Sequence, residues 1–103
     1  MFSDSFDRSK SERTQADRGI DFVQARVIWL DPSVRTVPAR MTEGQIRYAT
    51  IGFIGDKLWV AIWTDESPEA YADPSQEHEP KIRIISVHRA EGTKFERGYY
   101  GKD

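Results

Sequence analysis

Apolar and polar residues alternate along four stretches of the chain, and a period of two predicts β-strands with two different faces. Gly55-Asp56, between the second and third stretches, is typical of a tight hairpin turn, so these two strands should pair antiparallel. The pattern therefore predicts an antiparallel sheet of three or four strands. The stretches are Val34–Val37, Ile46–Ile54, Leu58–Thr64 and Lys81–His88.

A polar segment near the start of the chain has the signals of a solvated helix. It runs from Ser9 to Arg18, with Glu12 at the spacing of a capping box and Gly19 just past its end. We therefore expect a first helix capped near Ser9.

Two further helices complete the predicted fold. Asp21 is a candidate N-cap for a short buried helix that ends at Asp31-Pro32, because the apolar residues between them fall at helical spacing. The segment from Arg89 to Tyr100 is expected to form a terminal helix. Together these elements predict one α+β domain over residues 1–103. Two N-terminal helices pack on the antiparallel sheet, and a C-terminal helix follows.

Strand alternation also assigns side chains to the faces of the sheet. Trp59 and Trp63 should share a face, where packing in the core or against a partner is favoured over the stacking of bases. In the last strand, Arg83 and Arg89 should lie on one face and His88 on the other, unless a bulge interrupts the alternation. A simple pairing of His88 with the arginines is therefore not expected.

Charge is unevenly distributed along the 103 residues. The net charge is −2, but six of the 17 acidic residues lie between Asp65 and Pro80, a segment without Lys or Arg. Without this segment, 15 basic and 11 acidic residues remain, so the rest of the domain is mildly basic. The three prolines of the segment indicate an acidic hairpin insertion at about 65–80.

Composition also narrows the class of protein. The chain has no cysteine, which excludes disulfides and thiolate chemistry, and its two histidines are too few to predict a metal site. No apolar run is long enough to span a membrane, and no signal peptide is recognisable. We therefore expect a cytoplasmic protein without a cofactor.

The run Arg83-Ile-Ile-Ser-Val-His-Arg-Ala90 resembles a signature of the BrnT family, the toxin halves of type II toxin–antitoxin pairs. That signature reads Arg-Ile-Ile-Ser-Ala-Arg-(Arg/Lys)-Ala. Further family motifs are matched in the same order, over roughly residues 6–97. They are Phe6-Asp7 with Lys10, Gly19-Ile20-Asp21-Phe22 with Ala25, Leu30-Asp31-Pro32, Glu43-Gly44 with Arg47 before Ile51-Gly52, and Leu58 with Val60.

The resemblance implies a RelE-like fold and a ribonuclease activity that stops translation. It also implies a cognate antitoxin of the ribbon-helix-helix type (BrnA-like) that neutralises the toxin in a hetero-oligomer.

Cleavage of RNA without a metal requires groups that stabilise extra negative charge on a phosphate. Arginine suits this role because it is permanently charged and its guanidinium fork fits phosphate. The candidates for binding phosphate are Arg47, Arg83, Arg89 and Arg18, the last of which stands where the family has a histidine.

Cleavage also requires a proton acceptor for the 2′-hydroxyl and a proton donor for the departing 5′-oxygen. His88 suits these roles because the ordinary pKa of histidine lies near neutrality. Lys10 is a candidate to supply positive charge or a proton. Glu43 is the candidate carboxylate base, because it lies near the matched Arg47 in the sequence. The predicted catalytic set is therefore Lys10, Arg47, Arg83, His88 and Arg89.

Two other readings remain open. Asp17-Arg18 replaces the Lys-His that the family has before its helix–helix glycine, and the acidic insertion is unusual for the family. Both departures favour a non-catalytic, degenerate toxin-fold module that only binds a protein partner. A housekeeping domain unrelated to toxins is the third reading, and it requires the ordered motif matches to be coincidental.

Overall fold

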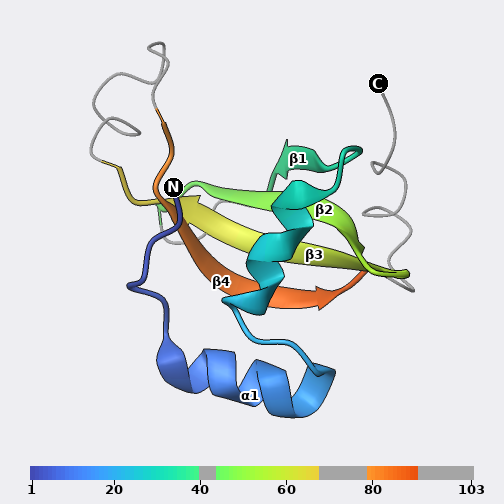
Figure 1. The fold of residues 1–103 in the computed structure, drawn as a ribbon. Helices are drawn as coiled ribbons and strands as arrows, with labels where there is room; N and C mark the ends of the chain where they lie inside the picture. Colours follow the sequence, from blue (N-terminus) through green and yellow to red (C-terminus); the bar gives the residue numbers. More distant parts are fainter. Residues whose placement is uncertain (40–43, 68–78, 91–103) are drawn as a thin grey trace.

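A computed structural model of the protein describes residues 1–39, 44–67 and 79–90. It shows an α+β architecture in which a four-stranded antiparallel sheet, in the order β1-β2-β3-β4, carries a short helix across one face (Figure 1). The predicted terminal helix does not begin at Arg89, because Arg89 is the last residue of β4; residues 91–100 of that prediction and most of the predicted insertion lie outside the described residues. The elements are α1 (Arg8–Arg18), η1 (Gln24–Leu30), β1 (Arg35–Pro38), β2 (Arg47–Ile54), β3 (Lys57–Asp65) and β4 (Ile82–Arg89).

Helix α1 begins earlier than the sequence predicted. Asp7, not Ser9, is the N-cap, and its Oδ1 accepts a hydrogen bond of 3.0 Å from the backbone N–H of Lys10. A carboxylate is as good a cap as a hydroxyl, and it also favours the positive end of the helix dipole. The end of the helix was predicted correctly, because Gly19 takes the left-handed conformation, with φ of 89°.

The second helical segment, η1, is a 3₁₀ helix. Its N-cap is Val23, whereas the sequence predicted Asp21. Asp21 stabilises the preceding turn instead: Asp21 Oδ1 accepts a 2.7 Å hydrogen bond from Gln24 N–H, and Gln24 Oε1 accepts one of 2.9 Å from Asp21 N–H. The segment lies against β2 at Gly52, where an added Cβ would stand 2.8 Å from the backbone oxygen of Ile28. Only glycine permits this approach, which sets the distance between η1 and the sheet.

The two faces of β3 were predicted correctly. Trp59 and Trp63 are 4% and 6% exposed and pack in the cluster beneath η1 that includes Phe22 and Ile28. The alternate residues of β3 are buried on the opposite face, in a second cluster that includes Leu58. The tryptophans are therefore core residues, not a platform for bases.

A β-bulge in β4 breaks the predicted alternation. Ile62 pairs with Ser86 and its neighbour Trp63 pairs with Ile84, so Ile85 is an extra residue without a partner position. An extra residue inverts the faces of everything that follows it in the strand. Val87 consequently joins Ile84 in the cluster beneath η1, although the sequence placed these two residues on opposite faces.

Helix α1 is nearly devoid of apolar residues, and it is held to the body of the domain mainly by its first half. Ser11 Oγ accepts a 3.0 Å hydrogen bond from the buried backbone N–H of Phe22, whose ring lies edge-on to Phe6. Figure 1 shows α1 below the sheet, beside the edge strand β4. None of the helices in the described ranges has the length and apolar character to cross a membrane.

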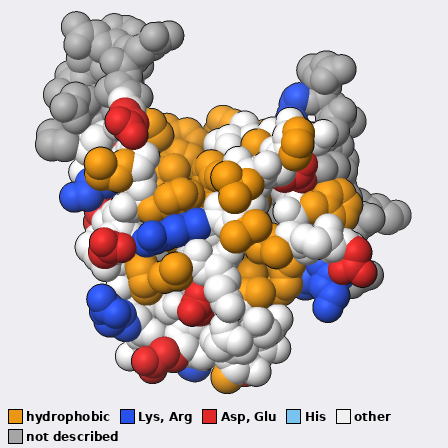
Figure 2. Space-filling model, in the orientation of Figure 1, with side chains coloured by type: hydrophobic (Ala, Val, Ile, Leu, Met, Phe, Trp, Pro, Cys, Tyr) orange, Lys and Arg blue, Asp and Glu red, His pale blue; other side chains and the backbone are white. Residues whose placement is uncertain are grey.

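Apolar side chains gather on the face that carries η1, as Figure 2 shows. Val23, Val27 and Leu30, which belong to η1 or lie next to it, are exposed there. The basic residues that line the hollow described below instead come from the opposite face of the sheet and from α1.

Candidate active site

Two of the predicted arginines lie in one row across the sheet. Arg47 of β2 pairs with Thr64 of β3, and Thr64 pairs with Arg83 of β4. Directly paired residues of antiparallel strands project to the same face. Thr64 is buried and donates a 2.8 Å hydrogen bond to the carbonyl of Ile46, so it fills the row without competing for a ligand.

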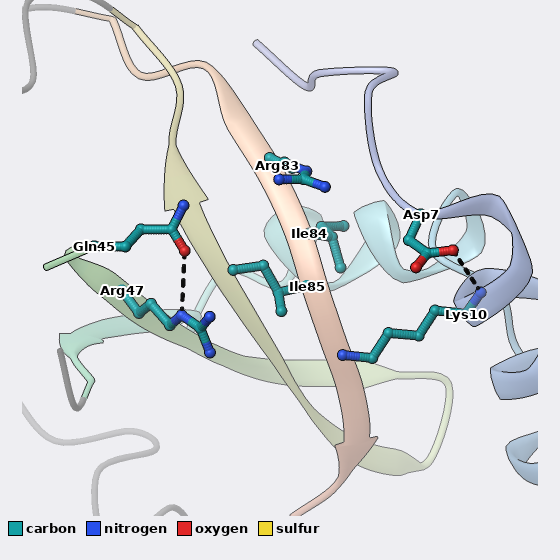
Figure 3. A pocket seen from close by; sticks show the side chains of 7 residues that line it. All are labelled: Asp7, Lys10, Gln45, Arg47, Arg83, Ile84 and Ile85. Atoms are coloured by element: carbon teal, nitrogen blue, oxygen red, sulfur yellow. Dashed lines mark hydrogen bonds between the residues drawn. The ribbon is translucent and has the colours of Figure 1, made fainter. Parts of the chain in front are cut away.

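A hollow of about 200 Å³ is lined by the residues at both ends of this row. Lys10 reaches it from α1, and Figure 3 shows its ammonium group extended toward β4, the strand that carries Arg83, with Arg47 on β2 on the other side of that strand. Arg47 is oriented by a 3.4 Å hydrogen bond from its Nε to Gln45 Oε1. The side chains around the hollow include Asp7, Lys10, Gln45, Arg47, Arg83 and Ile85.

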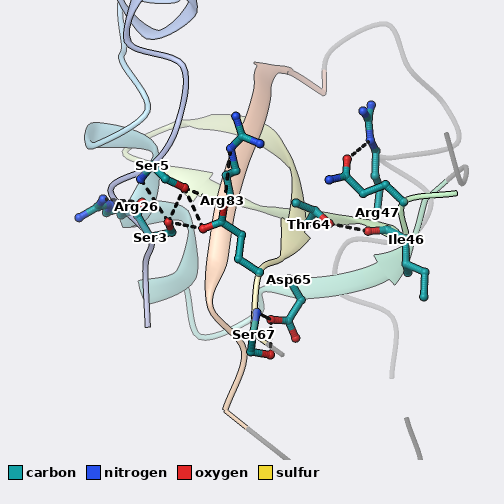
Figure 4. A network of polar contacts seen from close by, with 11 residues as sticks. Ser3, Ser5, Arg26, Ile46, Arg47, Thr64, Asp65, Ser67 and Arg83 are labelled. Atoms are coloured by element: carbon teal, nitrogen blue, oxygen red, sulfur yellow. Dashed lines mark hydrogen bonds and ion pairs between the residues drawn. The ribbon is translucent and has the colours of Figure 1, made fainter. Parts of the chain in front are cut away.

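Arg83 is supported from behind by a carboxylate that sequence reasoning missed. Its Nε lies 3.9 Å from Glu66 Oε2, and the guanidinium points away from this contact (Figure 4). Glu66 is fixed in turn by hydrogen bonds from the hydroxyls of Ser3 and Ser5, the latter at 2.7 and 2.8 Å. The N-terminal segment therefore helps to position Arg83.

The same environment sets the ionisation of Glu66. Burial alone would raise the pKa of this carboxyl, but the hydrogen bonds from Ser3 and Ser5 and the charges of Arg83 and Lys81 together outweigh burial. The pKa of Glu66 therefore lies below its ordinary value, and the side chain is ionised at neutral pH.

Asp65 fixes the ends of the β3–β4 connection. Its Oδ1 accepts hydrogen bonds from Ser67 N–H, Ser67 Oγ and Lys81 N–H at 2.9, 2.7 and 2.9 Å. The backbone N–H of Glu66 also donates to the carbonyl of Lys81 at 2.8 Å. Two acidic residues of the predicted insertion thus have structural roles beside Arg83.

Arg89 and His88 do not lie where the sequence placed them. The bulge at Ile85 moves Arg89 to the face that carries η1, where its guanidinium lies 5.5 Å from the centre of the Trp59 ring. His88 shares the face of Arg83 instead. It pairs with Val60, four residues along β3 from the partner of Arg83, which is a separation of about 13 Å along the strand. The bulge is the exception that the sequence analysis allowed for, so both residues lie on the faces opposite to those that simple alternation predicts, and neither lines the hollow.

Arg18 lies at the far end of α1, outside this hollow. It lines a second, shallower hollow between α1 and β4, which also contains Lys10, Arg13, Asp17 and Ser86. Of the predicted site residues, the structure therefore brings together Lys10, Arg47 and Arg83, and it places Arg18 in an adjacent depression.

Asp7 also lines the hollow, and sequence reasoning did not assign it to the site. It is the N-cap of α1, so the same carboxylate begins the helix and faces the cations. Its position three residues before Lys10 was the available signal, because an N-cap necessarily lies near the third residue of the helix. Glu43, the carboxylate that the sequence suggested, lies outside the described residues.

Three cationic groups, one carboxylate and one amide around a small hollow suit a ligand with a concentrated negative charge, such as a phosphodiester. In the parts of the chain that the structure describes, no group of three or more His, Asp or Glu side chains is arranged to hold a metal ion.

Comparison with known proteins identifies the family. A search of the curated proteins finds no match to the chain. The family model described as "Ribonuclease toxin, BrnT, of type II toxin-antitoxin system" matches residues 6–93, a span that contains Lys10, Arg47 and Arg83. The chain therefore belongs to the BrnT family of ribonuclease toxins of type II toxin–antitoxin systems.

Proposed function

We propose that this toxin cleaves RNA without a metal ion, at the hollow formed by Lys10, Arg47, Arg83 and Asp7. The observation that carries the proposal is the convergence of these side chains from α1, β2 and β4 on one depression. No two of these elements are consecutive in the chain, so local sequence does not explain why their charged groups meet. A phosphodiester would offset the repulsion among the three cations.

The proposed reaction is an internal transfer at phosphorus. The 2′-oxygen of one nucleotide forms a bond to the adjacent phosphorus and gives its proton to a base. The bond from phosphorus to the 5′-oxygen breaks, and this oxygen takes a proton from an acid. The products are a 2′,3′-cyclic phosphate and a free 5′-hydroxyl.

The arginines stabilise the charge that develops on phosphorus. Arg83 is the main candidate, because its Nε lies 3.9 Å from the Glu66 carboxylate and its terminal nitrogens are turned away from that contact. Arg47 contributes a second guanidinium group from the opposite end of the row, across Thr64. Preorganised donors of this kind commonly contribute about 10²- to 10³-fold to the rate.

We assign proton transfer to Asp7, the N-cap of α1, and to Lys10 in its first turn. Asp7 Oδ1 is engaged by the helix N-terminus, and we assign its other oxygen the role of base toward the 2′-hydroxyl. Lys10 lies in the same hollow and is assigned the departing 5′-oxygen, as a proton donor or as a stabilising charge. His88 is not part of this scheme, because it lies about 13 Å away along β4.

The cellular role follows from family membership and from the sequence motifs. We propose that cleavage inhibits translation in the cytoplasm and that a BrnA-like antitoxin of the ribbon-helix-helix type neutralises the toxin in a hetero-oligomer. A RelE-like fold belongs to the same proposal, which the four-stranded antiparallel sheet supports.

Purified protein and a labelled single-stranded RNA in the presence of EDTA test the chemistry. We expect the wild type to produce 2′,3′-cyclic phosphate ends and Lys57→Gln to cleave at the same rate. The rate of Arg83→Gln should be reduced by about 10²-fold or more. Lys57 is a suitable control because it is exposed at the β2–β3 turn, remote from the hollow. Expression of the chain alone should arrest bacterial growth, and a full-rate Arg83→Gln enzyme would refute the assignment.

A non-catalytic module that binds a protein partner is the second candidate. The separation of His88 from Arg47 and Arg83 favours it, because no imidazole among the described residues lines the hollow. This candidate predicts soluble protein that neither cleaves RNA nor arrests growth but still binds its antitoxin.

A further inference from the structure

The second hollow continues the first along α1. Lys10 lines both depressions, so they meet at its side chain. From there the second depression follows α1 through Arg13 to Arg18, with Ser86 of β4 on its other side. Eight residues of α-helix separate Lys10 from Arg18, which corresponds to about 12 Å. The two hollows are therefore adjacent, with Lys10 common to both, and we refer to the pair as the track.

The charge of the second hollow favours an anion. Arg13 and Arg18 are both exposed, and together with the shared Lys10 they give three positive charges against the single carboxylate of Asp17. Ser86 is half-buried and makes no hydrogen bond to any described residue, so its hydroxyl is available to a ligand. The proton of Thr14 is already committed, because its Oγ1 donates to the carbonyl of Lys10 at 2.9 Å.

The residues of the track indicate contact with a backbone and not with bases. Among residues 1–39, 44–67 and 79–90, no aromatic side chain lines either hollow, and the apolar residues present there are Ile84, Ile85 and Val87. Recognition of unpaired bases ordinarily uses aromatic rings as stacking platforms. The track therefore suits consecutive phosphates, whose positions are independent of base identity.

The length of the track is sufficient for more than one phosphate. Phosphates follow one another at about 3.4 Å along the axis of a duplex strand and lie further apart in an extended single strand. Over about 12 Å, the track can therefore meet at least one phosphate in addition to the one at Arg83. A single strand fits better than a duplex, since only a flexible backbone readily aligns its 2′-oxygen with the bond to be broken.

We propose that the hollow of Arg13, Arg18 and Ser86 is a subsite for a phosphate of single-stranded RNA next to the phosphate that is cleaved. The proposal rests on the proposed function, because it takes the Arg83 hollow as the place of cleavage. It makes Arg13 and Arg18 binding residues that confer a preference for longer, single-stranded substrates. It gives them no part in the chemical step.

Binding of a 2′-O-methyl RNA tests the subsite, because methylation removes the nucleophile. Fluorescence anisotropy with a hexanucleotide over a range of salt concentrations compares the wild type with Arg13→Gln/Arg18→Gln. Each lost phosphate contact lowers the slope of log Kd against log salt by about 0.7 for a single strand. We expect the slope of the double variant to fall by about 0.7 to 1.4, and Asp17→Asn to bind more tightly than the wild type.

A dinucleotide and a remote charge supply the controls. A dinucleotide has one phosphodiester, so its binding at the Arg83 hollow, followed by NMR titration, should be equal for the wild type and the double variant. Lys57→Gln removes one positive charge at the β2–β3 turn and should leave the hexanucleotide slope unchanged. If the double variant behaves like Lys57→Gln, or loses the dinucleotide equally, the subsite is refuted. Failure of the proposed function is a separate result, in which Arg83→Gln binds and cleaves like the wild type.

Discussion

Replacing Glu66 by Gln removes one negative charge from behind Arg83 while keeping the size of the side chain. In the wild type this carboxylate receives hydrogen bonds from Ser3 and Ser5 and lies 3.9 Å from Arg83 Nε. An amide keeps one acceptor oxygen, but it loses the charge and part of the hydrogen bonding. The substitution therefore isolates the energetic contribution of ionised Glu66.

The expected magnitude follows from this geometry. Two unit charges at this distance attract by about 4 kcal/mol at an effective dielectric constant of 20 and by about 1 kcal/mol in bulk water. The Arg83 side chain is 37% exposed and that of Glu66 is 28% exposed, so solvent screening brings the value to about 1 kcal/mol or below. Hydrogen bonds to a charged acceptor exceed those to a neutral one by about 1 kcal/mol. We therefore expect Glu66→Gln to lower the free energy of unfolding by about 1–2 kcal/mol at pH 7.

The lowered pKa of Glu66 determines how the stability difference between the wild type and Glu66→Gln changes with pH. The pKa of Glu66 is lowered in the folded protein, so its contribution to stability is present at neutral pH, above the ordinary value of 4.5. The contribution disappears as the pH falls through the lowered pKa. The stability of the wild type and Glu66→Gln should therefore converge as the pH falls below the ordinary pKa and the wild-type carboxyl becomes protonated.

Urea denaturation followed by tryptophan fluorescence at several pH values measures the difference. Glu12→Gln is the matched control, because Glu12 is exposed on α1 and its replacement should change stability by no more than about 0.5 kcal/mol. A difference between the wild type and Glu66→Gln that is constant from neutral to acidic pH would refute the ionic argument. No difference at neutral pH would show that the contact with Arg83 contributes nothing.

Three further predictions concern the core, the active site and the cap. Gly52→Ala places a Cβ 2.8 Å from the backbone oxygen of Ile28, so it should lower the free energy of unfolding by about 1–3 kcal/mol. Thermal or urea denaturation measures this change, and an unchanged stability would contradict the close packing of η1. The RNA cleavage rate of His88→Gln should be within a few-fold of the wild-type rate, because His88 lies about 13 Å along β4 from Arg83. A loss of two orders of magnitude in this rate would mean that the imidazole acts in the reaction. Asp7→Ser keeps a good N-cap, so the stability of α1 should be retained while the cleavage rate falls about 10²-fold, and equal activity would exclude Asp7 as the base.

The sheet was largely predictable from the sequence because its signals are local. Alternation along Leu58–Thr64 reports burial on both faces, and Gly55-Asp56 fixes the turn that pairs β2 with β3. Gly19 identified the end of α1 for the same reason, since its left-handed conformation is required by a single turn of chain. Each of these features depends on residues that are close together in the sequence.

The candidate site was only partly predictable, because one extra residue inverts the faces of the last strand. A bulge is decided by packing between strands, and the run Ile84-Ile85 offers two equivalent aliphatic residues for a single core position. Before the bulge, alternation placed Arg83 correctly. After the bulge, alternation placed His88 and Arg89 on the wrong faces. Glu66 was missed because its partners, Ser3 and Ser5, lie more than 60 positions away in the sequence.

The central claim is that the hollow at Arg83, and not the other basic residues of the signature strand, handles the phosphate. Arg83→Gln and Arg89→Gln make the same chemical change six positions apart in the sequence, on opposite faces of the sheet. The direct measurement is the initial rate of single-stranded RNA cleavage in EDTA by the wild type and both variants. The structure predicts a loss of about 10²-fold or more for Arg83→Gln and a rate within a few-fold of the wild type for folded Arg89→Gln. The reverse order, or an equal loss in both variants, would contradict the assignment.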